Sequence, residues 1–159
     1  MLKKKNNLKR PALFLDRDGV INKDCGFVYK IKDLIYEKKI FKIVRHYYER
    51  NFLIIIISNQ SGIGRKIYTE KLLDKFNNKI KKDFLSKKIL ISDVYICPHH
   101  PNDNCKCRKP QPTMINEAIK DWNIDRSKSL MIGDKFSDYE AAKKARINFF
   151  YKEKIETYF

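Results

Sequence analysis

Two aspartates separated by one residue end the first apolar run of the chain. Asp16 and Asp18 follow Phe14 and Leu15 and precede Gly19. Because alternate side chains of an extended chain point to the same side, both carboxylates can face one ligand. One could attack a phosphorus atom and be phosphorylated, while the other protonates the leaving oxygen and then activates water. The pair therefore predicts phosphoryl-transfer chemistry.

Three later segments supply the other groups that such a reaction needs. Ser58 offers a hydroxyl and Lys109 an ammonium group, and both could hold oxygens of the transferred phosphate. Asp134 follows Gly133 and adds a carboxylate. Because converging carboxylates repel a phosphate, we expect Mg²⁺ with oxygen ligands that include Asp134. Each segment alone is a weak signal, but the ordered set is a strong one.

A second group of side chains offers ligands to a softer metal. Between residues 97 and 107 the chain reads Cys-x-His and then Cys-x-Cys. One structural Zn²⁺ takes four such ligands. A disulfide is one alternative, which a cytoplasmic location disfavours, and a surface loop with free thiols is another. We favour zinc, which would hold a loop that lacks regular secondary structure.

The apolar periodicity predicts the elements that position these groups. Short apolar runs alternate with longer amphipathic stretches, which is typical of a Rossmann-like α/β fold with a parallel sheet flanked by helices. We expect strands at 12–16, 52–57, 93–96, 129–132 and 147–151. Helices are expected at about 38–50, 69–85, 113–122 and 137–145. The second would carry Leu72, Phe76, Ile80 and Phe84 on one face, and the last would begin with a capping box at Ser137. Asp16, Ser58 and Asp134 then each follow a strand, at the edge where open α/β sheets bind ligands.

Length and composition predict one globular domain over 1–159, with a basic, flexible N-terminus over 1–10. The apolar run 53–57 is too short to span a membrane, and the polar N-terminus is unlike a signal peptide. We therefore expect a cytoplasmic protein without a membrane partner. The lack of a long apolar surface stripe favours a monomer.

The chain is strongly basic, with 35 Lys and Arg against 19 Asp and Glu and a formal net charge of +16. Clustered cations bind nucleic acids by neutralising phosphates. Here the lysines are spread along the chain, and no stretch interleaves them with aromatic residues in a nucleic-acid motif. We favour a compositional bias over nucleic-acid binding, although net basicity could attract a small anionic substrate.

The ordered motifs resemble the haloacid dehalogenase (HAD) superfamily of aspartate-nucleophile phosphatases over residues 11–145. The segment 14–20 looks like its first motif, Ser58 its second, Lys109 its third and Gly133-Asp134 its fourth. The resemblance implies a HAD-like fold with Asp16 as nucleophile and Asp18 as general acid and base. It also implies that Asp16, Asp134 and the Asp18 carbonyl hold Mg²⁺. A chain of this length has no room for a cap domain, so loops must select the substrate.

Within the superfamily, the chain resembles the branch of heptose bisphosphate and histidinol phosphatases, which carry a zinc loop. That resemblance implies a structural Zn²⁺ on Cys97, His99, Cys105 and Cys107, and it leaves His100 out. The expected substrate contacts are Asp24, Cys25, Gly26, Phe27, Asn59, Gln60, Ser61, Arg65, Arg108 and Lys135.

These features lead to one functional expectation and three alternatives. The first is Mg²⁺-dependent removal of the 7-phosphate from D-glycero-D-manno-heptose 1,7-bisphosphate, in the synthesis of nucleotide-activated heptose for surface polysaccharide. The second is histidinol-phosphate hydrolysis, which would need a carboxylate for the substrate amine; the sequence identifies none. The others are a nucleic-acid 3′-end phosphatase and a zinc-stapled binding module without catalysis.

Overall fold

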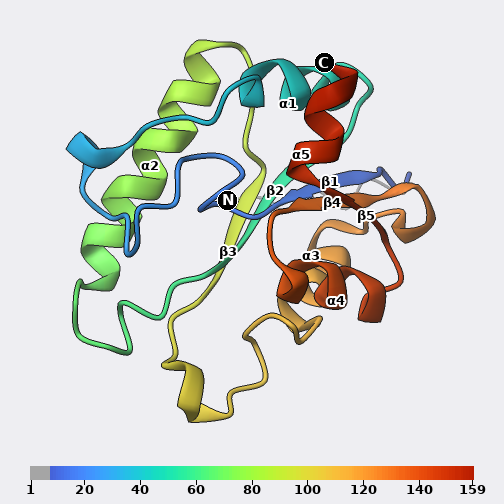
Figure 1. The fold of residues 1–159 in the computed structure, drawn as a ribbon. Helices are drawn as coiled ribbons and strands as arrows, with labels where there is room; N and C mark the ends of the chain where they lie inside the picture. Colours follow the sequence, from blue (N-terminus) through green and yellow to red (C-terminus); the bar gives the residue numbers. More distant parts are fainter. Residues whose placement is uncertain (1–7) are drawn as a thin grey trace.

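A parallel sheet forms the centre of the computed structural model, which describes residues 8–159 (Figure 1). Most of the predicted flexible N-terminus therefore lies outside the described residues. The strands have the spatial order β3-β2-β1-β4-β5, and each neighbouring pair is parallel. Their bounds are β1 (Ala12–Leu15), β2 (Leu53–Asn59), β3 (Asp93–Cys97), β4 (Leu130–Gly133) and β5 (Asn148–Tyr151). The predicted parallel α/β fold is confirmed.

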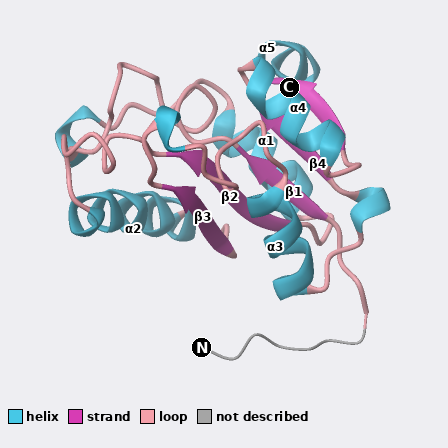
Figure 2. Cartoon of the chain, turned by 90° about the horizontal axis from the view of Figure 1, so that it is seen from below, coloured by secondary structure: helices cyan, strands magenta, loops and turns pink. Residues whose placement is uncertain are grey.

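Helices cover both faces of the sheet (Figures 1 and 2). Their bounds are α1 (Ile40–Tyr48), α2 (Glu70–Ser86), α3 (Thr113–Trp122), α4 (Phe136–Lys144) and α5 (Lys152–Ile155). On one face α1, α2 and α5 share an apolar core, and on the other α3 and α4 do. None of the helices formed by residues 8–159 is both long and apolar enough to cross a membrane.

The central strand β1 shows why the sheet is buried on both faces. Leu13 and Leu15 pack into the core under α1 and α2, whereas Ala12 and Phe14 pack into the core under α3 and α4. Successive side chains of a strand point to opposite faces, so a strand covered on both sides must be apolar throughout. This is the reason that continuous apolar runs could be recognised as strands.

Three local expectations were wrong. Ser58 belongs to β2, because the strand continues to Asn59 and pairs with β3 there. In α2 the buried residue of the first turn is Leu73, and the expected Leu72 is 40% exposed. Thr69, at the start of the expected range, caps this helix, since its side chain accepts a hydrogen bond from the Leu72 N–H.

The third error concerns the start of α4. This helix begins at Phe136 with Lys135 as its N-cap, two positions before the expected cap at Ser137. The Asp138 carboxylate accepts the N–H of Lys135, so it closes the capping box that we had placed on Ser137. The short helix α5, which follows β5 directly, was not anticipated from the sequence.

Candidate active site

The carboxyl edge of the sheet brings the predicted groups together. Asp16 follows β1 and its N–H continues the strand ladder by donating to Ile132 O at 3.1 Å. Asp134 follows the adjacent strand β4, and Ser58 lies near the end of β2 on the other side of β1. Asp16 and Ser58 are buried. Parallel pairing therefore places the three side chains at one edge, as the strand pattern predicted.

Lys109 reaches this edge from the loop before α3 and is buried. Its Nζ lies 2.6 Å from Asp16 Oδ1 and 2.6 Å from Asp138 Oδ1. It also donates to Ile57 O at 3.0 Å. The Asn59 side chain holds the Lys109 backbone, since Oδ1 accepts its N–H at 3.0 Å and Nδ2 donates to its C=O at 3.1 Å. The end of β2 thus fixes a lysine between two carboxylates.

Asp138 is a site residue that the sequence reasoning missed. It lies in the first turn of α4 and is 1% exposed. Besides the Lys109 ion pair, its Oδ2 accepts the N–H groups of Asp134 at 3.2 Å and Lys135 at 3.1 Å. The signal was present, because Asp138 stands one helical turn after Asp134. The sequence analysis gave Asp138 no role, because it lies inside the capping box expected at Ser137.

Asp16, Asp134 and Asp138 form a compact group of carboxylates. Their ligand oxygens lie within 4.8 Å of one another. Burial raises the pKa of Asp16, the Asp138 carboxylate raises it further, and the Lys109 ammonium opposes both. Burial also raises the pKa of Asp134. Burial alone would lower the pKa of Lys109, but the two carboxylates outweigh it and raise that pKa. A set of hard oxygen donors with this excess of negative charge fits Mg²⁺.

Asp18 lies beside this group and is held by neighbouring donors. Arg17 Nη2 and Gln60 Nε2 each donate to Asp18 Oδ2 at 2.9 Å. Gln60 Nε2 also donates to Ser58 Oγ at 2.7 Å, and the Tyr68 hydroxyl donates to Gln60 Oε1 at 2.6 Å. A network of buried amide and hydroxyl groups therefore links the expected acid and base to the second motif.

A cavity of about 260 Å³ opens onto these groups. Its lining includes most of the residues expected to contact substrate or phosphate: Asp16, Asp18, Asp24, Gly26, Phe27, Asn59, Gln60, Ser61, Arg108, Lys109 and Lys135; the sequence reasoning missed Tyr68, Ser137 and Asp138. Four of the residues predicted for catalysis, substrate contact or Mg²⁺ binding do not line this cavity: Cys25, Ser58, Arg65 and Asp134. Cys25 is exposed, and the Arg65 guanidinium carbon lies 5.9 Å from the centroid of the Phe27 ring.

Two residues of the cavity lining form an ion pair. Lys135 Nζ lies 2.9 Å from Asp24 Oδ2, and both residues are exposed. Burial would raise the pKa of Asp24, but the Lys135 ammonium and the Gly26 N–H outweigh it and lower that pKa. The loop at 24–27 is thereby joined to the start of α4, next to Asp134.

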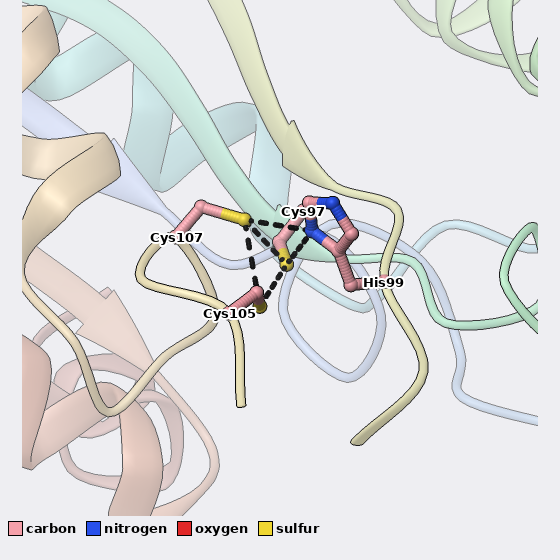
Figure 3. Close-up of side chains that lie close together, drawn as sticks. All are labelled: Cys97, His99, Cys105 and Cys107. Atoms are coloured by element: carbon pink, nitrogen blue, oxygen red, sulfur yellow. Dashed lines mark hydrogen bonds between the residues drawn. The ribbon is translucent and has the colours of Figure 1, made fainter. Parts of the chain in front are cut away.

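The cysteine and histidine side chains of the 97–107 loop converge on one point (Figure 3). Cys107 Sγ lies 2.8 Å from Cys97 Sγ and 3.7 Å from Cys105 Sγ, and His99 Nδ1 lies 3.1 Å from Cys107 Sγ. A disulfide needs about 2.05 Å between sulfurs, and all the cysteines are free. His100 instead caps a short 3₁₀ turn, where its Nδ1 accepts the Asn102 N–H. The converging set is the one that the resemblance implied, and it fits a tetrahedral Zn²⁺.

The Cys/His loop is attached to the carboxylate edge through the backbone. The Gln60 N–H donates to Cys97 O at 2.7 Å, and the Gly64 N–H donates to Pro98 O at 2.8 Å. A Cβ on Gly64 would lie 2.5 Å from the backbone N of His100, so only glycine allows this approach. Because Cys107 is followed by Arg108 and Lys109, the position of the loop also affects the buried lysine.

Comparison with known proteins places this chain in a family. A sequence profile described as haloacid dehalogenase-like hydrolase matches residues 100–152. The D-glycero-alpha-D-manno-heptose-1,7-bisphosphate 7-phosphatase of Campylobacter jejuni is 42% identical over 140 residues, which cover 88% of this chain and 80% of that protein. The D-glycero-beta-D-manno-heptose-1,7-bisphosphate 7-phosphatase of Helicobacter pylori is 39% identical over 137 residues, which cover 86% of this chain and 79% of that protein.

The fold has the same relatives. The crystal structure of D,D-heptose 1,7-bisphosphate phosphatase from B. bronchiseptica, complexed with magnesium and phosphate, superposes with a TM-score of 0.84 at 24% identity. The match covers 94% of this chain and 87% of that one, so the whole architecture is shared. The chain therefore belongs to the haloacid dehalogenase-like hydrolases, among relatives that are named heptose bisphosphate phosphatases.

Proposed function

We propose that the protein removes the 7-phosphate from D-glycero-D-manno-heptose 1,7-bisphosphate in the synthesis of nucleotide-activated heptose. The observation that carries the proposal is the buried Asp16 carboxylate, which lies 2.6 Å from Lys109 Nζ in the lining of a cavity. Arg108 and Lys135 add cations to the same lining, which suits a substrate with two phosphates. Relatives that cover more than four fifths of this chain are named for this reaction.

In the first half-reaction, an Asp16 oxygen attacks phosphorus while the bond to the sugar oxygen breaks. Asp18 gives its proton to that departing oxygen, so a neutral alcohol leaves. In the second half-reaction, Asp18 takes a proton from water as the water oxygen attacks the phosphorus of phospho-Asp16. The Asp16 carboxylate and inorganic phosphate are released. Lys109 and Ser58 would hold phosphate oxygens during both steps.

Two metal ions complete the proposal. Asp16 and Asp134, with the Asp18 carbonyl, would hold Mg²⁺, which neutralises the charge of carboxylates and phosphate. Cys97, His99, Cys105 and Cys107 would hold a structural Zn²⁺. Because these thiols must remain reduced to bind zinc, we propose that the protein works in the cytoplasm. We also propose that it acts as a monomer, because the sequence has no long apolar surface stripe.

Asp24 bears on the choice between heptose and histidinol substrates. Histidinol phosphate carries an amine, and Asp24 is a carboxylate at the cavity that could receive it. However, Lys135 already pairs with Asp24 at 2.9 Å. A substrate amine would have to displace an ammonium group of the same charge, whereas a second phosphate would be attracted to Lys135. This pairing favours the bisphosphate.

The direct test is release of inorganic phosphate with Mg²⁺ from heptose 1,7-bisphosphate, L-histidinol phosphate and a 3′-phosphorylated oligonucleotide. An Asp16→Asn variant is assayed beside the native chain on each. Preference for the heptose, lost in the variant, supports both the reaction and the nucleophile. Preference for another substrate would retain the mechanism and overturn the substrate. Absence of release from all three by folded, metal-loaded protein would overturn the proposal.

A further inference from the structure

Arg17 lies between the two aspartates and is fully buried, with 0% of its surface exposed. A guanidinium group out of water is costly unless it is paired and hydrogen-bonded. Its Nε donates to Asp18 Oδ1 at 3.1 Å, and its Nη2 donates to Asp18 Oδ1 and Oδ2, each at 2.9 Å. The proposed reaction assigns no step to this residue. Its burial and its contacts therefore call for a separate explanation.

The other side of the guanidinium is anchored to α2 and to the cavity loop. Nη1 donates to Asn77 Oδ1 at 3.3 Å, and the guanidinium carbon lies 4.6 Å from the centroid of the Phe76 ring. Nη2 also donates to Val28 O at 2.5 Å. Both Phe76 and Asn77 are buried in the middle of a helix. Helix α2 thus holds the Arg17 guanidinium that binds Asp18.

Two amide side chains also donate hydrogen bonds to the Asp18 carboxylate. Asn22 Nδ2 donates to Asp18 Oδ1 at 2.9 Å, and Gln60 Nε2 donates to Oδ2 at the same distance. Both amide residues are buried. The Asp18 side chain therefore has donors on both carboxylate oxygens, and of these three donor residues Arg17 alone contacts both oxygens. The bidentate contact with the Arg17 guanidinium therefore mainly determines the orientation of the Asp18 carboxylate.

We propose that Arg17 is a positioning residue, which holds the Asp18 carboxyl in line for proton transfer to the sugar oxygen and from water. The inference rests on the proposed function. General acid and base catalysis by one side chain contributes about 10² to 10⁴ in rate, and it depends on placement to a fraction of an ångström. Anchoring Asp18 to α2 through Arg17 provides that placement without a contact to the substrate.

A purely structural role for Arg17 makes a different prediction. If Arg17 only fills the core, or only holds the cavity loop through Val28, its loss lowers activity whether or not Asp18 can transfer a proton. If Arg17 acts through Asp18, its loss has no further effect once Asp18 is replaced. A double-mutant cycle separates these cases.

The cycle compares native protein, Arg17→Met, Asp18→Asn and the double variant by kcat/KM on the phosphate monoester that the native protein hydrolyses best. This ratio covers the steps through release of the sugar. Arg17→Met is expected to lower kcat/KM about 100-fold in the native background and less than about 3-fold in the Asp18→Asn background. An equal loss in both backgrounds would overturn the inference.

Two milder variants keep the test decisive if Arg17→Met does not fold. Arg17→Lys keeps the charge but loses the fork, and Asn77→Ala removes one anchor of the fork. Both should show a smaller loss, roughly 3- to 10-fold, that again disappears beside Asp18→Asn. Losses that persist in that background would contradict the proposal. Thermal unfolding of each variant accompanies the assay.

The cycle also distinguishes this inference from the proposed function. If the native protein releases phosphate from no monoester, the proposed function fails and the inference fails with it. If the native protein is active and the two substitutions act independently, only the role of Arg17 is overturned. A second readout uses p-nitrophenyl phosphate, whose leaving group needs no proton. There Arg17→Met should reduce kcat/KM by much less than with the sugar phosphate.

Discussion

The carboxylate edge, which holds Asp16, Asp134, Asp138 and Lys109, and the Cys/His loop are neighbouring sites. Their side chains are held in position by different interactions. Asp16 and Lys109, 93 residues apart, meet because strands and a buried hydrogen-bond network place them there. The Cys/His ligands all lie between residues 97 and 107, where only the end of β3 and one short 3₁₀ turn are regular. The first site is organised by the protein core, whereas the proposed Zn²⁺ would hold the ligands of the second together.

The two sites are nevertheless mechanically connected. Backbone hydrogen bonds join Gln60 to Cys97 and Gly64 to Pro98, and Lys109 follows Cys107 by two positions. A change in the Cys/His loop should therefore alter the position of Lys109 among the catalytic carboxylates. Replacing a charged side chain among those carboxylates should leave the Cys/His loop intact. The following experiments test this asymmetry, from the largest expected effect to the smallest.

Asp16→Asn should abolish turnover while sparing the Cys/His loop. The amide cannot act as the attacking carboxylate, so we expect kcat to fall on the order of 10⁴-fold or more. Zinc content should stay at one ion per chain, measured by elemental analysis beside phosphate release. Asp74→Asn, an exposed change on α2, is the matched control and should keep native activity. Loss of zinc from Asp16→Asn would break the proposed asymmetry.

Lys109→Met should damage both stability and activity, because it leaves Asp16 and Asp138 as buried carboxylates without their shared cation. Breaking a buried ion pair by removing one partner costs about 3–5 kcal/mol of unfolding free energy. Urea unfolding measures this cost, with the exposed Lys75→Met as the matched surface change. We expect kcat to fall roughly 10³-fold. A change below about 1 kcal/mol would show that the ion pair contributes little to the folded state.

Removal of zinc should lower the stability of the fold. It should also lower activity, because Lys109 would lose its fixed position. Binding to the folded state alone stabilises it by about 4 kcal/mol when the free metal is 1,000 times its Kd, so a zinc chelator should lower the melting temperature. We expect kcat/KM to fall roughly 10-fold as Lys109 loses its fixed position. Cys97→Ser should reproduce both effects, and Cys25→Ser should retain zinc. Full activity of the zinc-free protein would show that the two sites are independent.

Gly64→Ala tests the backbone contact between the sites without changing a ligand. The added methyl group would clash with the backbone at His100, so the metal loop must shift. We expect zinc affinity to fall roughly 10-fold in a competition assay with a chromophoric chelator. Ile67→Ala, an exposed change in the same loop, is the control and should bind zinc like the native chain. If Gly64→Ala bound zinc with unchanged affinity, the backbone contact at Gly64 would not contribute to the conformation of the Cys/His loop.

Lys135→Ala should have the smallest effect. The ion pair with Asp24 is exposed, and such pairs contribute about 1 kcal/mol or less, so the melting temperature should barely change. Loss of a cation from the cavity should raise KM for a bisphosphate by roughly 3- to 10-fold and change kcat little. The comparison uses steady-state kinetics with a bisphosphate and a monophosphate substrate. Equal effects on the two would argue against a contact with the second phosphate.

Several features were predictable because their signal is local. The strands buried on both faces stand out as continuous apolar runs, and the residues that end β1 and β4 follow directly from them. The cysteines and histidines of the Cys/His loop are close in sequence, so their spacing predicted a metal site, and the resemblance selected His99 over His100. The side of α2 that packs inward was less certain, and Leu73 rather than Leu72 is buried, since a small rotation of a helix changes which residue faces the core.

The order of the strands and of α1 to α4, the reactive residues at the strand ends and the composition of the Cys/His loop could be read from local sequence. The tertiary structure alone decided which side chains meet: Asp138 with Lys109, Asp24 with Lys135, and Arg17 with Asn77. These contacts join positions far apart along the chain, and they depend on strand order and helix placement. Local spacing carries no information on such pairings, because only packing of the whole core brings the partners into contact.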